Sequence, residues 1–139
     1  MRLISFIMLI LLMAGCASTK NTSVKNKQLN GTWLPIKQEI GGKAFPAAVY
    51  QNQKLVIKDS TYTVVAESVD KGIVKFNGNK MDIYGKEGVN VGKHFTAIYK
   101  LENDELTICY NLAGNAYPEA FETTGKMTFF LSVFKKERK

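Results

Sequence analysis

This 139-residue chain contains few cysteines and histidines, the residues that most often serve in nucleophilic catalysis and in zinc sites. There are two cysteines, Cys16 and Cys109, and a single histidine, His94. Cysteine catalysis needs a thiolate activated by a neighbouring base, and no histidine lies near either cysteine in sequence. One histidine and two cysteines are too few for most multi-ligand zinc or haem sites. We therefore predict no catalytic residue, no metal site, no cofactor and no enzymatic activity.

The surroundings of His94 and Cys109 agree with this prediction. His94 alternates with Phe95, Ala97 and Tyr99, which places the histidine on the outer face of a strand. Cys109 lies among apolar residues in the segment 106–110, which is typical of a buried and unreactive thiol.

A glycine-rich segment, Gly85–Lys93, has some likeness to a phosphate-binding loop. That motif would need glycine at position 87, where Glu87 stands, and Ser or Thr after Lys93, where His94 stands. No helix is predicted after the segment. We interpret it as the loop of a β-hairpin.

The N-terminal residues have the pattern of an export signal. Arg2 precedes Leu3–Met13, an eleven-residue stretch that is apolar apart from Ser5. A membrane-spanning helix needs about 20 residues, whereas the apolar part of a secretory signal has about 7–15. The next residues, Met13-Ala-Gly-Cys16, resemble a bacterial lipobox, in which the cysteine becomes the lipidated first residue of the mature protein. An ordinary signal peptide with a chance cysteine is the alternative.

These features divide the chain into a signal peptide at 1–15, a flexible tether at 16–29 and a folded domain at 30–139. The lipobox implies a membrane anchor through lipid on Cys16. Ala17, rather than Asp, follows Cys16. By resemblance to outer-membrane sorting signals, this predicts an anchor in the outer membrane with the domain facing the periplasm.

The net charge of +7 is located at the ends of the chain. Residues 31–134 contain eleven Lys, eleven Asp or Glu and no Arg. Because Arg carries most recognition of base edges, a neutral body without Arg predicts no nucleic-acid binding. The basic residues of the tether would face anionic lipid head groups, or they belong to a simple solvated linker.

The body of the chain is predicted to be all-β. Short β-branched and aromatic runs are separated by turn-forming Gly, Asn and Asp, and several runs alternate between apolar and polar residues. One short helix is predicted over Pro46–Gln51. Eight antiparallel strands joined in sequence order predict an up-and-down β-barrel, with a β-sandwich as the alternative. The expected strands are 31–40, 53–58, 61–67, 71–77, 80–84, 93–101, 105–111 and 127–135.

Three blocks of this sequence resemble a bacterial lipocalin-like domain family of unknown function. They are 29–33 followed by 41–43, then 97–110, and finally 129–136. The first contains Gly31-Thr-Trp33, which resembles the Gly-x-Trp signature of lipocalins. The resemblance implies a small β-barrel and supplies no catalytic residues. In lipocalins a late arginine packs on this tryptophan, and Arg138 is the candidate here.

The resemblance and the aromatic inward faces together predict that the barrel interior is the functional site. The link 40–53 would cross one mouth as a lid, with Val49 among its apolar residues. The lid residues Phe45 and Tyr50 are therefore expected to belong to the site. The interior residues expected to line or fill it are Trp33, Tyr62, Phe76, Phe95, Tyr99, Tyr110 and Phe129.

The predicted function is a lipid-anchored envelope lipoprotein whose barrel binds a small apolar or amphiphilic molecule. A non-enzymatic protein-interaction barrel, a scaffold or an inhibitor, is the alternative. This alternative is suggested by the loop 85–93 and by the aromatic residues of the link 112–126, because exposed aromatic residues are common at protein interfaces. No particular protein partner is predicted.

The charge pattern limits the ligand. No Arg lies between Gly31 and Phe134, and Lys75 is the one lysine whose direction the pattern leaves open. A buried carboxylate needs a cationic partner, so an interior ligand is predicted to be neutral or to keep its charge at the mouth, near the 40–53 lid.

Overall fold

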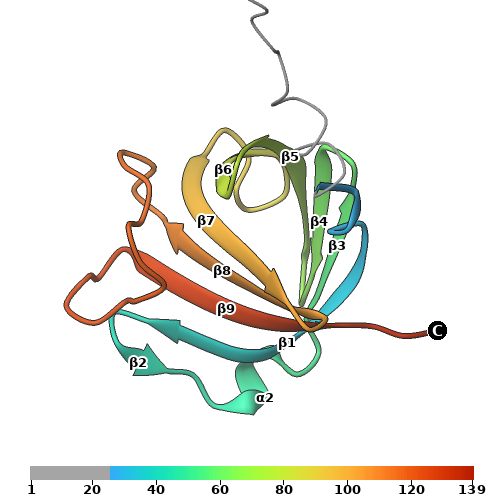
Figure 1. The fold of residues 1–139 in the computed structure, drawn as a ribbon, viewed down its shortest axis with the longest axis horizontal. Helices are drawn as coiled ribbons and strands as arrows, with labels where there is room; N and C mark the ends of the chain where they lie inside the picture. The colour runs from blue at the N-terminus through green and yellow to red at the C-terminus, as the bar shows by residue number, and fades with distance from the viewer. Residues whose placement is uncertain (1–25) are drawn as a thin grey trace, which may run out of the picture.

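The structure is a computed structural model that describes residues 26–139. The predicted signal peptide, Cys16 and the start of the tether lie outside the described residues. One antiparallel sheet contains β1 (Gly31–Ile40), β2 (Lys43–Ala44), β3 (Lys54–Lys58), β4 (Thr61–Val65), β5 (Val69–Asn77), β6 (Lys80–Glu87), β7 (His94–Glu102), β8 (Glu105–Asn111) and β9 (Phe129–Lys136) (Figure 1).

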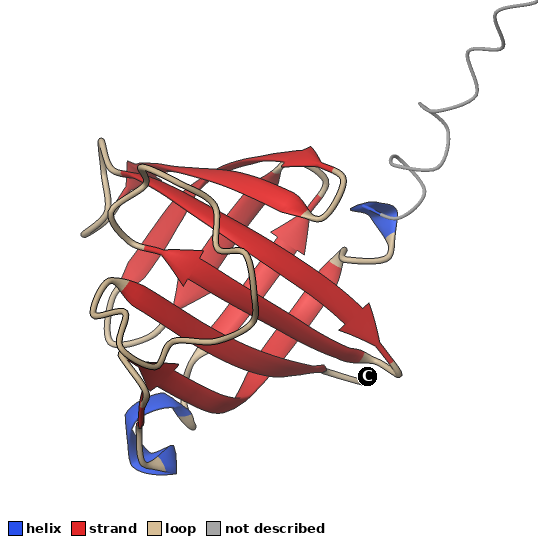
Figure 2. Ribbon diagram, turned by 60° about the vertical axis from the view of Figure 1, so that its left-hand side comes forward, coloured by secondary structure: helices blue, strands red, loops and turns tan. Residues whose placement is uncertain are grey.

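Pairing between β1 and β9 closes this sheet into a barrel. Seven residue pairs join the two strands, from Trp33 opposite Lys136 to Ile40 opposite Phe130. A bulge at Ile36 shifts the register, and such bulges help a sheet to bend. Figure 2 shows the strands tilted around a common axis, as closure requires. The predicted up-and-down barrel is confirmed, and the sandwich alternative is wrong.

The eight predicted strands are all present; 31–40 and 105–111 match at both ends, and the other strands have ends that differ by at most three residues. The predicted helix is also present as α2 (Ala47–Tyr50), with Pro46 at its N-cap. The two-residue strand β2 was not predicted. It pairs only with the end of β1, and the barrel wall consists of the other eight strands.

The two ends of the barrel differ. The turns at 59–60, 78–79 and 103–104 are tight, and Asp59, Asn103 and Asp104 adopt positive φ there, which Asn and Asp tolerate better than most residues. The longer connections, 41–53, 88–93 and 112–128, all lie at the opposite end, because consecutive strands run antiparallel. We call these the tight-turn end and the long-loop end.

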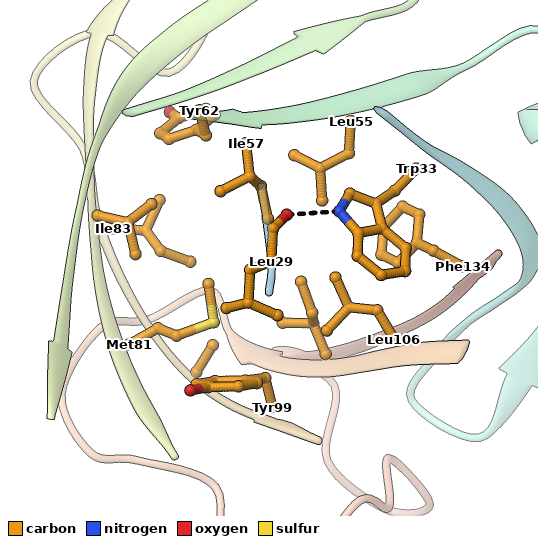
Figure 3. Close-up of a cluster of buried hydrophobic side chains, with 13 residues drawn as sticks. Leu29, Trp33, Leu55, Ile57, Tyr62, Met81, Ile83, Tyr99, Leu106 and Phe134 are labelled. Atoms are coloured by element: carbon orange, nitrogen blue, oxygen red, sulfur yellow. Dashed lines mark hydrogen bonds between the residues drawn. The ribbon is translucent and has the colours of Figure 1, made fainter. Parts of the chain in front are cut away.

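Trp33 closes the tight-turn end. Its side chain is fully buried, and its indole Nε1 donates a hydrogen bond to the carbonyl oxygen of Leu29 over 2.7 Å (Figure 3). Lys136 lies over the indole ring, with Nζ 5.2 Å from the ring centre. A Cβ on Gly31 would meet Lys136 Cε at 2.8 Å, so the glycine makes room for the lysine stem. The expected arginine partner is wrong: Arg138 donates to Asp104 on the surface.

A second apolar cluster lies outside the barrel wall. Ile98, Cys109 and Leu131 point outward from β7, β8 and β9 and are buried. The link 112–128, drawn in orange at the left of Figure 1, covers them with Tyr117 and Phe121. Strand β9, whose residues 129–134 are apolar apart from Ser132, is therefore covered on both faces. Cys109 is a free buried thiol, and burial raises its pKa.

Within residues 26–139, none of the helices has the length and apolar character that crossing a membrane would need.

Replacing Trp33 with Ala is expected to lower the free energy of unfolding by about 3–5 kcal/mol, because it removes a fully buried ring from the tight-turn end of the barrel. Urea denaturation followed by circular dichroism measures this, since the variant lacks the only tryptophan. Val69→Ala, at a side chain that is 47% exposed, is the control and should cost less than about 1 kcal/mol. Equal losses in the two variants would contradict the role of Trp33.

Candidate functional site

The barrel interior contains a cavity of about 170 Å³ towards the long-loop end. Residues from most strands of the wall contribute to it, and its surface is predominantly apolar. The lining residues are Leu55, Ile57, Tyr62, Val64, Asp70, Val74, Met81, Ile83, Asn90, Phe95, Ile108, Tyr110, Leu112 and Phe130.

A second cavity of about 320 Å³ adjoins the first beneath the lid formed by 40–53. Phe45 and Val49 of the lid line it, and Phe45 lies 6.5 Å from Phe130 between ring centres. Four residues line both cavities: Leu55, Val64, Tyr110 and Phe130. The two spaces therefore lie side by side at one end of the barrel.

The structure divides the predicted interior residues between two places. Tyr62, Phe95 and Tyr110 line the cavity at the long-loop end. Trp33, Phe76 and Tyr99 pack in the core outside that cavity, where Phe76 and Tyr99 meet edge to face at 5.8 Å. These three residues pack at the tight-turn end of the barrel, and the cavity lies towards the long-loop end.

Two predicted residues lie elsewhere. Phe129 was expected inside, but it packs against the outer cluster, and Phe130 takes the interior position. Register explains the correction, because Phe130 lies opposite the inward-facing Tyr110 on β8, so its neighbour must point outward. In the lid, the Tyr50 hydroxyl donates to the carbonyl of Ile36 and Tyr50 does not line either cavity.

Asp70 is a cavity residue that the sequence analysis missed. Asp70 lies near the start of β5, is only 6% exposed to solvent, and lines the interior cavity. The Tyr62 hydroxyl donates to its Oδ2 over 3.1 Å. Asn90 donates twice, from its backbone N–H to Oδ1 and from its side-chain amide to Oδ2, each over 3.1 Å. The carboxylate thereby joins the wall to the loop 88–93.

Glycines make this arrangement possible. Gly72 lies opposite Tyr62, and a Cβ there would come within 2.6 Å of the tyrosine ring. A Cβ on Gly85 would come within 1.8 Å of the Asn90 carbonyl oxygen, and one on Gly88 within 2.9 Å of Asp70 Cα. The glycine-rich segment is a hairpin loop as predicted, and its glycines allow it to fold over the cavity.

The tyrosines of the cavity are held in their neutral form. Burial, together with the nearby Asp70 carboxylate that accepts its hydrogen bond, raises the pKa of Tyr62 well above its usual value. Burial also raises the pKa of Tyr110. Both side chains therefore supply hydroxyl groups without charge over the physiological pH range.

One further polar group lies between the lid and the wall. Gln38 is buried, and its side-chain amide donates to Gln53 Oε1 over 3.0 Å and to the Ser132 hydroxyl over 3.4 Å. Gln38 and Gln53 line the lid cavity. Lys75 does not contribute a charge here, because it is exposed and its Nζ lies over the Tyr84 ring on the outside.

His94 lies on the outer face of the wall, as its alternation predicted. Its Nε2 lies 2.7 Å from Asp82 Oδ1, its ring stacks on Tyr84 at 4.6 Å, and the Tyr117 hydroxyl donates to Asp82 Oδ2. Burial opposes ionisation of Asp82, but the bonds from Tyr117 and His94 outweigh it and lower its pKa. His94 does not line the cavity, because its side chain lies on the opposite face of the wall from the lining residue Phe95, and it acts as a structural partner of Asp82.

No group of three or more His, Cys, Asp and Glu side chains in the described part of the chain is placed to hold a metal ion.

The sequence matches no known protein-family profile and no curated protein. Among solved structures, the chain is similar to an uncharacterized protein from Bacteroides eggerthii, with a TM-score of 0.52 and 10% sequence identity. The similarity covers 78% of this chain and 99% of that one. At this identity it supports the fold alone.

The raised pKa of Tyr62 predicts a loss of stability at alkaline pH. The unfolded tyrosine releases its proton near pH 10.0, while the folded one still holds it, so the unfolding free energy falls as pH rises above that value. Tyr62→Phe should therefore show a smaller fall between about pH 9 and pH 11. Urea denaturation across this range measures it. Tyr50→Phe, which changes a hydroxyl outside the cavity, should retain the wild-type slope; the same slope in all three proteins would contradict the assignment.

Proposed function

We propose that this protein is a lipid-anchored envelope lipoprotein whose lipocalin-like barrel binds a small apolar or amphiphilic molecule at its long-loop end. The observation that carries the proposal is the pair of adjoining cavities, of about 170 and 320 Å³, which share four lining residues at one end of the barrel. Ligand pockets are usually concave and mostly apolar with a few polar groups, which fits this lining.

The cavity sizes set the expected size of the ligand. An apolar cavity of about 150 Å³ can hold a benzene ring. The interior cavity therefore has room for one ring or a short branched chain, and the lid cavity for the rest of a longer molecule. A long-chain lipid held fully inside the barrel does not fit this space.

The lipid anchor rests on the sequence. Met13-Ala-Gly-Cys16 supports acylation of Cys16, and Ala17 supports sorting to the outer membrane. Several acyl chains on one cysteine would hold the protein firmly, whereas one chain gives only marginal binding.

The alternative, a barrel that binds another protein through its loops, has less support. Tyr117 and Phe121 of the link 112–128 are occupied in packing against the outer cluster. The observation that favours this alternative is the exposure of Val89 and Val91 in the loop 88–93, because exposed apolar side chains can contact another protein.

Filling the interior cavity is expected to abolish binding. Val64 lines both cavities, whereas Val65, the next residue of β4, points to the outside. The mature chain from residue 16, carrying Cys16→Ser, is titrated with 2-phenylethanol by calorimetry. We expect binding that Val64→Phe weakens at least about tenfold, since the ring occupies the space, and that Val65→Phe retains. No binding by the wild type, or equal binding by both variants, would contradict an interior site.

Acylation is tested by labelling cells with radioactive palmitate. We expect label on the wild type and none on Cys16→Ser, because that cysteine is the only one in the lipobox. Cys109→Ser, which removes the buried thiol, should keep the label. Label on Cys16→Ser would overturn the lipoprotein assignment.

A further inference from the structure

The interior cavity contains a buried negative charge without a positive partner. Asp70 is 6% exposed, and the hydrogen bonds that it accepts come from Tyr62 and Asn90, which are neutral donors. None of the ion pairs found in residues 26–139 involves Asp70. The neighbouring Lys71 is exposed and faces Glu87 at 3.8 Å.

A buried carboxylate is costly unless it is paired with a cation. Two carboxylate oxygens can accept about four hydrogen bonds, and three are formed here. Capacity remains for one more donor at the surface of the cavity. A ligand that brings a positive charge and an N–H group would supply both the missing charge and the missing hydrogen bond.

The rest of the lining suits such a ligand. Tyr62, Phe95, Tyr110 and Phe130 line the same cavity as Asp70. Aromatic faces attract ammonium groups, most strongly where water is excluded. Apart from Asn90, the remaining lining residues are apolar, so the cavity combines one anionic group with largely apolar surfaces. A carboxylate ligand would be repelled at the same place.

The position of Asp70 is also held firmly. Asn90 fixes the carboxylate from the loop side and Tyr62 from the wall side, and the loop itself is closed by a hydrogen bond from the Gly85 N–H to the Lys93 carbonyl over 3.0 Å. A site whose anionic group is already oriented loses less entropy when a ligand binds.

We propose that the interior cavity recognises a small amphiphilic amine, whose protonated amino group binds Asp70 while its apolar part lies among the aromatic side chains. This rests on the proposed function and specifies the chemical class of its ligand. The sequence predicted that any charge of the ligand would stay near the lid 40–53, which follows β1. Asp70 would place this charge on β5 instead, and β5 and β6 lie across the barrel from β1 and β9.

The test compares three probes of matched shape on the Cys16→Ser chain: 2-phenylethylamine as the cation, 2-phenylethanol as the neutral analogue and phenylacetate as the anion. Calorimetric titration should show the amine binding about tenfold tighter than the alcohol or better, and phenylacetate binding weakest. Equal affinities for amine and alcohol would overturn the proposal.

Variants locate the preference. Asp70→Asn should remove most of the advantage, measured as the ratio of the affinities for the amine and the alcohol in the same variant. Glu87→Gln, which removes an exposed carboxylate at the same end of the barrel, should leave the advantage unchanged. If Glu87→Gln abolishes the advantage as Asp70→Asn does, the preference comes from surface charge and the proposal is wrong.

Asp70→Asn could fail to fold, because Asp70 joins the loop 88–93 to the wall. Tyr62→Phe then provides the second test, since it keeps the carboxylate and removes only one of its donors. The amine should retain or increase its advantage in this variant. Loss of the advantage would show that the carboxylate alone does not carry recognition and would overturn the proposal.

The results also separate this proposal from the proposed function. Binding of 2-phenylethanol that Val64→Phe abolishes, without a preference for the amine, would retain the interior site and leave Asp70 as a purely structural link. If none of the three probes binds, both the interior binding site and the recognition of an amine by Asp70 are contradicted.

Discussion

The closure of the sheet by β1 and β9 is the constraint on which the other features depend. Their seven residue pairs leave no free edge in the barrel wall and give every strand an inside and an outside. The inside must then be filled with side chains or left hollow. Trp33, Phe76 and Tyr99 pack into the half at the tight-turn end, whereas the side chains around Tyr110 leave a cavity in the other half. The cavity is therefore the part of the closed interior that the inward-facing side chains do not fill.

The strands and turns could be predicted because alternation and turn residues are local properties. The position of Phe129 could not, because β9 is apolar on both faces and carries no alternation that distinguishes one face from the other. Its outer face is buried only because the link 112–128 returns across it, which is a long-range contact. Similarly, the resemblance to lipocalins made Arg138 the expected partner of Trp33, whereas the register of β9 against β1 places Lys136 over the ring.

Asp70 shows why the polar half of the site escaped prediction. In sequence it stands beside Lys71 and Gly72 and has the composition of a turn. Only the folded chain shows that β5 already begins at Val69, that Gly72 leaves space for the Tyr62 ring, and that Asn90 reaches Asp70 across 20 residues. Glycine and aspartate are ambiguous residues, since they serve both turns and close packing. Their role depends on neighbours that local patterns do not reveal.

Both chain termini of the described structure lie at the tight-turn end, where β1 starts and β9 ends. The cavities lie towards the other end, beneath the lid and the loop 88–93. A chain held by lipid at Cys16 would thus be attached at the base of the barrel, with its mouth directed away from the attachment point. The chain that leads to such an attachment would leave the lid and the loop 88–93 unobstructed, so both borders of the cavities stay open to solvent.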